Sequence, residues 1–354
     1  MRHFTTKAQR FVLCFSLCLG INSVSCLAQT PSPSPNSQKI FDFHSDFWIN
    51  LHHFLYLVAL SEKTPKGPHP ATMNQVDVET LNTLSENERA AWNQAVSYYA
   101  DSMIEHDLLF DENMGGLKNQ LEDAGTSRDL ASANLPAELK QVLLKAAPIY
   151  RKYWWARHDA QNRQWVAQLE PLVERYGESL KDSLIRIYEV PWPSHPVRVD
   201  ATVYASQYGA YTTNDPTRPT ISTTDPANQG NAALEIVFHE TSHGMMKKVM
   251  DVMSEAARNV NGSNQSKAFR SRTLWHAVLF YTAGELVAEQ IPEYVPYADK
   301  NGLWMRAWPS PDRSLIVQDW KPHMNGSVEL QPALTKLVHD LAAAQQQKDT
   351  GPPH

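Results

Sequence analysis

The sequence predicts a mostly helical α+β protein in which a small sheet lies beside one helix that carries the motif His239-Glu240-Thr241-Ser242-His243. Two observations support this class. Apolar residues recur at helical spacing through most of the chain, as in Trp48, Leu51 and Leu55. Strand-like alternation of apolar and polar residues is confined to a short region directly before the motif, which indicates a small sheet next to that helix.

The N-terminal segment, 1–28, has the organisation of a secretory signal peptide. Arg2, Lys7 and Arg10 precede the apolar run 11–21, and small residues follow up to Ala28, after which we expect cleavage. The apolar run is too short to span a membrane comfortably. We therefore expect a secreted or periplasmic protein with no transmembrane segment in the mature chain.

All three cysteines lie inside this segment, at positions 14, 18 and 26. Cleavage after Ala28 would leave no cysteine, so we expect no disulfide bond in the mature protein. An alternative interpretation is a lipid anchor on Cys26, although Ser23-Val-Ser-Cys26 lacks the leucine that usually precedes such an anchor.

Composition places the rest of the chain among ordinary globular proteins. Of the 354 residues, 42% are hydrophobic and 20% are charged, which excludes disorder as the main state. The formal net charge is −6. Removal of the signal peptide would take away three basic residues and no acidic one, giving −9. This negative charge argues against nucleic acid as a partner.

Residues 29–39 are rich in proline and serine and predict an extended spacer. We expect an N-terminal helical part over 40–190. Its first helix should span 41–60, Ser85 and Glu88 should form a capping box, and Pro171 should break or kink a later helix.

The second part, 191–344, is predicted to hold the site. Strands are expected at 197–203 and 220–224, and Asp225 with Pro226 should start the motif helix. A last helix over 334–344 should precede a disordered tail, 345–354.

The motif has the spacing of a catalytic zinc site. Residues four apart on a helix lie one above the other, so His239 and His243 can bring two imidazoles to one metal. Glu240 stands beside them, where it can act as a general base on water.

A catalytic zinc needs a third protein ligand. Glu285 shares an apolar helix face with Leu274 and Val278, and a carboxylate there needs a cation, so we predict Glu285 as the ligand. Glu289 should support a ligating histidine. The alternative for Glu285 is an ion pair with a neighbouring arginine such as Arg272. His276 falls on the opposite side of the same helix from Glu285 and should pack elsewhere.

Between Val197 and Ile291 the chain resembles the gluzincin metallopeptidases, which combine H-E-x-x-H with E-x-x-x-[D/E] on the next helix. The resemblance implies that His239, His243 and Glu285 bind zinc, that Glu240 is the general base, and that Glu289 orients His239. Gly284 and Glu289 depart from the asparagine and aspartate usual in thermolysin-like enzymes.

The predicted function is therefore zinc-dependent hydrolysis of a peptide or protein substrate. Two alternatives remain: a zinc hydrolase of a non-protein amide or cell-wall peptide, and an inactive secreted binding module. The reaction also needs a donor for the developing oxyanion. The sequence does not choose among the candidates Tyr211, Tyr281, Tyr294, Tyr297 and His323.

Overall fold

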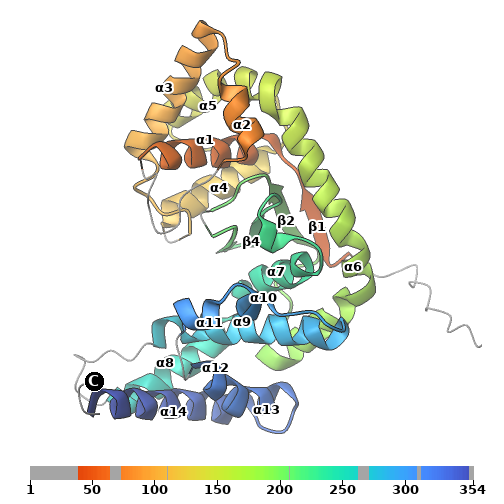
Figure 1. The fold of residues 1–354 in the computed structure, drawn as a ribbon, viewed down its shortest axis with the longest axis vertical. Helices are drawn as coiled ribbons and strands as arrows, with labels where there is room; N and C mark the ends of the chain where they lie inside the picture. Colours follow the sequence, from red (N-terminus) through yellow and green to blue (C-terminus); the bar gives the residue numbers. More distant parts are fainter. Residues whose placement is uncertain are drawn as a thin grey trace, which may run out of the picture. The chain divides into compact units, whose positions relative to one another are not determined.

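The computed structural model describes residues 39–63, 73–109, 111–206, 208–261, 271–308 and 312–350. The predicted signal peptide and all but the last residue of the spacer lie outside these ranges. The described chain is mostly helical with one small mixed sheet, which confirms the predicted class (Figure 1).

Within the described residues, the sheet has four strands in the order β1-β2-β4-β3. They are β1 (Phe41–His44), β2 (Val197–Thr202), β3 (Ala210–Asn214) and β4 (Thr217–Ser222). β1, β2 and β4 are parallel, while β3 pairs antiparallel with β4 and forms one edge. The strands predicted near 197 and 220 are present.

The prediction of a helix from residue 41 was wrong for its first residues. Phe41 and Phe43 alternate with Asp42 and His44, and this period of two forms β1, which pairs with β2. The sheet thus joins strands from the two predicted parts, 40–190 and 191–344, and contacts place both in a single unit, Gln38–His354.

In the described ranges, five helices precede the longest one: α1 (Phe47–Lys63), α2 (Gln75–Leu81), α3 (Glu86–Ser102), α4 (Glu112–Ala124) and α5 (Ala137–Tyr150). They enclose an aromatic core that includes Trp48, Trp92 and Trp154. The predicted capping box is confirmed: Ser85 caps α3, and Glu88 bonds back to the Ser85 backbone.

The longest helix, α6 (Ala156–Tyr188), follows a π-turn at Arg151–Trp155 and connects the N-terminal helices to the sheet and to the C-terminal helices. Pro171 lies inside α6 and does not break it, so of the two predicted effects, a break or a kink, the break is absent. Pro171 and Ala167 are both exposed, so water can bond to the carbonyl that the proline leaves without a donor.

The C-terminal half contains α7 (Asn231–Ser242), α8 (Lys247–Asn261), α9 (Ser271–Gln290), α10 (Tyr297–Lys300), α11 (Leu303–Arg306), α12 (Asp312–Leu315), α13 (Lys321–Met324) and α14 (Leu330–Thr350). The predicted start of the motif helix and both predicted ends of the last helix, 334–344, were wrong. Asp225 caps only the 3-10 turn Pro226–Asn228, and α7 starts after Gly230. The predicted disordered tail is helical as far as Thr350.

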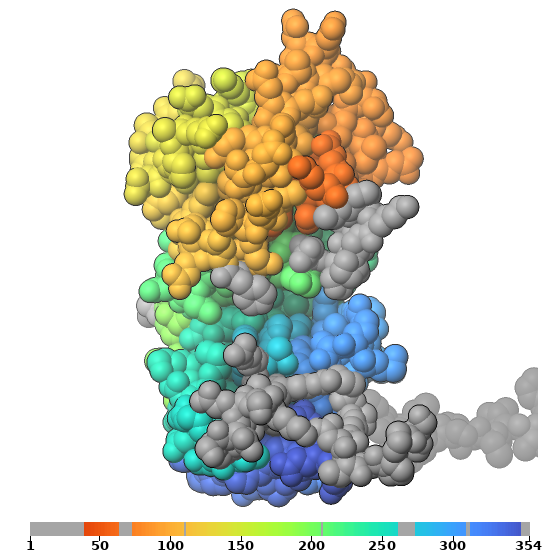
Figure 2. All heavy atoms as spheres, turned by 90° about the vertical axis from the view of Figure 1, so that its left-hand side faces the viewer, coloured from red at the N-terminus to blue at the C-terminus, as the bar shows by residue number. Residues whose placement is uncertain are grey.

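The sheet and α7 lie between the N-terminal helices and the C-terminal helices. Figure 2 shows that green and teal atoms from the middle of the chain reach the surface between them. Among the described helices, none is both long and apolar enough to cross a membrane.

Candidate functional site

The helix α7 carries the motif in a buried position beside the sheet. It packs against α6, α9, β3 and β4, and His239 is only 1% exposed. The hydroxyls of Thr241 and Ser242 donate to the carbonyls of Val237 and Phe238, at 2.8 Å each, so these buried polar groups are satisfied within the helix.

His243 stands at the end of α7, where the chain enters a 3-10 turn, His243–Met245. The next residue must be small, because a Cβ on Gly244 would collide with the side chain of Thr217 on β4. This close approach fixes the end of α7 against the sheet and so fixes His243.

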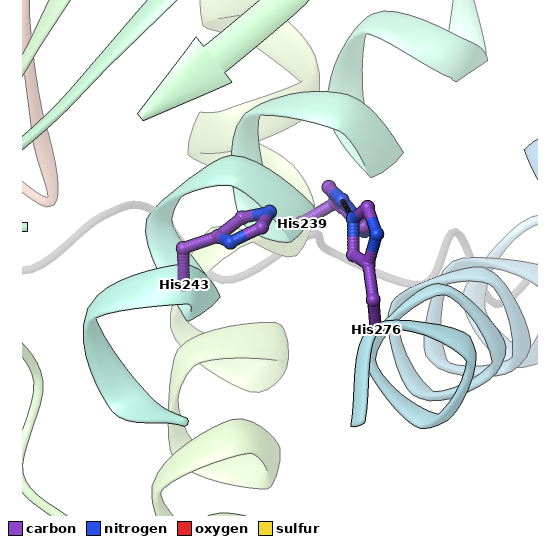
Figure 3. A group of neighbouring side chains, drawn as sticks. All are labelled: His239, His243 and His276. Atoms are coloured by element: carbon purple, nitrogen blue, oxygen red, sulfur yellow. Dashed lines mark hydrogen bonds between the residues drawn. The ribbon is translucent and has the colours of Figure 1, made fainter. Parts of the chain in front are cut away.

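The third histidine comes from α9 and was not predicted. His276 projects from α9 toward His239 and His243 (Figure 3). The two helices run antiparallel, since His239 packs on Phe280 with ring centroids 3.8 Å apart, while His243 and His276 lie 5.1 Å apart. One ligand atom from each histidine lies within 4.8 Å of the others.

This arrangement fits a metal ion. The Nε2 atoms of His239 and His276 are 3.3 Å apart. Two nitrogens bound to a tetrahedral zinc at 2.0–2.1 Å are also about 3.3 Å apart. The residues present can therefore hold a metal, and three imidazoles suit zinc, copper, iron or nickel.

The electrostatics also favour metal binding. Burial lowers the pKa of His276 to about 4. Burial and the neighbouring imidazoles hold the pKa values of His239 and His243 well below the ordinary value. All three rings are therefore neutral at neutral pH, which is the state that binds metal ions.

The side chain of Glu240 lies close to the histidines. Its carboxylate Oε2 lies 4.0 Å from Nε2 of His243 and accepts a hydrogen bond of 2.7 Å from the hydroxyl of Thr212 on β3. Thr212 also bonds to the Glu240 carbonyl at 2.9 Å. Burial raises the pKa of Glu240 to about 7. A carboxylate with this pKa can both take up and release a proton near neutral pH.

Neither of the two glutamates predicted on α9 lies at the histidines. The Glu285 carboxylate is 2.6 Å from the ammonium group of Lys321. Since His276 faces α7 and a separation of nine residues is two and a half helical turns, Glu285 points away from α7. Glu289 is exposed, so it cannot support the buried His239. The alternative prediction for Glu285 was an ion pair with a neighbouring arginine. Glu285 does form an ion pair, but its partner is Lys321.

The prediction that His276 packs elsewhere was wrong. The helical geometry was sound, because His276 and Glu285 do lie on opposite faces of α9. A signal for His276 was its residue type: an imidazole on a largely apolar helix is the same donor that the motif supplies twice.

Comparison with models of protein families, with curated proteins and with solved structures found no match.

Proposed function

We propose that this chain is a secreted zinc-dependent metallopeptidase in which His239, His243 and His276 hold the metal and Glu240 is the general base. The observation that carries the proposal is the combination of three converging neutral imidazoles with a buried carboxylate one residue from the first of them. A metal site with only a structural role does not need such a base.

When bound, zinc would act as a Lewis acid that polarises a carbonyl and makes water more acidic. Glu240 would accept a proton from the attacking water as its oxygen bonds to the carbonyl carbon. Glu240 would then give this proton to the leaving nitrogen as the C–N bond breaks. The hydrogen bond from Thr212 holds the carboxylate in place throughout.

The neighbouring sheet edge supports a peptide as the substrate. β3 pairs on one side with β4 and is the last strand of the sheet in the described structure. Thr212 of this strand contacts Glu240 directly. An extended peptide could add to β3 by backbone hydrogen bonds and bring its scissile bond to Glu240.

The proposed metal ligands agree with the gluzincin pattern in two residues and differ from it in the third. The H-E-x-x-H half supports a metallopeptidase, whereas a histidine in place of Glu285 sets the chain apart from the gluzincin ligand pattern. Secretion rests on residues 1–28, which lie outside the described structure. The negative net charge supports partners other than nucleic acid.

The test compares the zinc-loaded wild type with Glu240→Gln on unstructured proteins, cell-wall peptides and small amides. We expect the variant to keep zinc and to hydrolyse peptides about 10²- to 10⁴-fold more slowly. Activity on cell-wall peptides or small amides alone would change the substrate class. Equal behaviour of the two proteins on every substrate would contradict the proposal and favour a binding module.

A further inference from the structure

The proposed hydrolysis needs a hydrogen-bond donor for the carbonyl oxygen, which gains negative charge in the transition state. Four of the five candidates are engaged elsewhere. The Tyr211 hydroxyl is 2.7 Å from Nε2 of His53, and both ring nitrogens of His323 are 2.8 Å from backbone carbonyls. The other two are Tyr281, which lies beside Glu285 on the far face of α9, and Tyr294, whose hydroxyl donates to Glu235.

Tyr297 differs from these four. Among the described residues, no group forms a hydrogen bond with its hydroxyl, whereas its backbone N–H and carbonyl are both bonded. Its ring stacks on Phe280 with centroids 5.8 Å apart and an interplanar angle of 21°. Phe280 in turn packs on His239. The phenol therefore belongs to the same group of packed rings as the metal ligands.

The phenol also carries the correct protonation state. Burial raises the pKa of Tyr297 to about 12, and the negative charges of Asp225, Glu240 and Glu235 contribute to this shift. The hydroxyl keeps its proton at neutral pH and can donate it in a hydrogen bond.

Glu235 connects Tyr297 to α7, the helix that carries His239 and His243. It lies one turn before His239 on α7 and is fully buried. Its Oε2 accepts from the backbone N–H of Tyr297 at 2.8 Å and from the hydroxyl of Tyr294 at 2.7 Å. A buried carboxylate is costly unless hydrogen bonds satisfy it. Here these bonds fix the start of α10 relative to the histidines.

We infer that Tyr297 is a second catalytic residue, whose hydroxyl donates a hydrogen bond to the substrate carbonyl oxygen as it becomes negative. Glu235 is its positioning residue. No proton is transferred in this step; the phenol keeps its hydrogen while Glu240 carries the proton from water to the leaving nitrogen. The inference rests on the proposed function, since it assigns a role in the same reaction.

The test compares Tyr297→Phe with the matched variant Tyr281→Phe in the zinc-loaded full chain. Each loses one hydroxyl, but only that of Tyr297 is assigned to the site. For Tyr297→Phe we expect unchanged zinc content, little change in KM and a roughly 10²-fold lower kcat. Its affinity for a peptide phosphonate, which mimics the tetrahedral oxyanion, should fall at least tenfold by calorimetry. Tyr281→Phe should stay within twofold of the wild type.

A further variant, Tyr294→Phe, controls for a loss of activity that comes only from disturbed packing around Glu235. Tyr294→Phe removes one hydrogen bond to Glu235 and leaves the proposed donor, so its loss of kcat should be smaller than that of Tyr297→Phe. An equal or larger loss would overturn the assignment, as would wild-type kcat and phosphonate affinity in Tyr297→Phe. If Glu240→Gln also behaves like the wild type, the proposed function fails. If Glu240→Gln is impaired and Tyr297→Phe is not, only the role of Tyr297 fails.

Discussion

The neighbouring helices α7 and α9 both carry carboxylates in largely apolar surroundings, and they stabilise them differently. Glu285 on α9 meets the ammonium group of Lys321 and is 18% exposed. Glu235 and Glu240 on α7 are more deeply buried, and neither forms an ion pair with a lysine or arginine in the described part of the chain. Burial raises the pKa of each of these two to about 7.

The difference indicates which buried carboxylates are candidates for a functional role. A carboxylate with its own cation is explained by that pair and needs no further role. One that is buried and held only by hydroxyls and backbone N–H groups is costly, and groups with such perturbed pKa values cluster at functional sites. This criterion selects the α7 residues beside His239 and leaves Glu285 as a structural residue.

The largest expected effect concerns the pH dependence of stability. The pKa of Glu235 is about 7 in the folded protein, against 4.5 for the ordinary side chain. The folded state therefore holds the proton more tightly, and the contribution of Glu235 to stability falls as pH rises from about 4.5 to 7. A shift of this size corresponds to at most on the order of 3 kcal/mol.

We expect Glu235→Gln to become more stable relative to the wild type between pH 5 and pH 8, measured by urea unfolding of metal-free protein. The control is Glu289→Gln, an exposed change on α9 that should follow the wild type. A stability difference between Glu235→Gln and the wild type that does not change with pH would show that Glu235 is already ionised at pH 5.

A smaller effect is expected when Glu240 loses its hydroxyl partner. Thr212→Val keeps the shape of the side chain but removes the hydrogen bond that lowers the pKa of Glu240. We expect kcat/KM to fall about tenfold, a typical loss for one hydrogen bond to a charged group. Because Glu240, as the proposed base, must be ionised to accept a proton, the acid limb of the pH–rate profile should move to higher pH.

The adjacent Thr213 provides the control for that experiment. Its hydroxyl contacts Asn119 and Lys118 rather than Glu240. Lys118, whose charge lowers the pKa of Glu240, keeps its bonds to the Arg218 carbonyl at 2.6 Å and to Glu122 at 3.1 Å in this variant. Thr213→Val should therefore change stability without moving the acid limb. A shift of the limb in both variants would mean that the strand as a whole, and not the Thr212 hydroxyl, sets the pKa of Glu240.

Features that depend on the spacing of residues close together in the chain could be predicted from the sequence. Four-residue spacing predicted that His239 and His243 would converge with Glu240 beside them, and the capping box at Ser85 was also visible. The strand β1 was missed because so short a segment gives little periodicity, and its partner β2 lies far along the chain, beyond all of the N-terminal helices and α6.

The third histidine was missed for a different reason. Between Leu274 and Val287 most side chains of α9 are buried, with apolar residues on every side of the helix. A helix of this kind has no polar face that indicates which side meets a given neighbour. The choice is made by tertiary packing, in which Phe280 lies on His239 and Gly284 leaves room for Glu235.

The most direct test of the account is the zinc content of purified wild type, His276→Ala and Glu285→Ala after loading and removal of weakly bound metal. We predict about one zinc per chain in the wild type and in Glu285→Ala, and little or none in His276→Ala. Folding of each variant is checked by circular dichroism. Zinc retained by a folded His276→Ala and lost from a folded Glu285→Ala would contradict the three-histidine site.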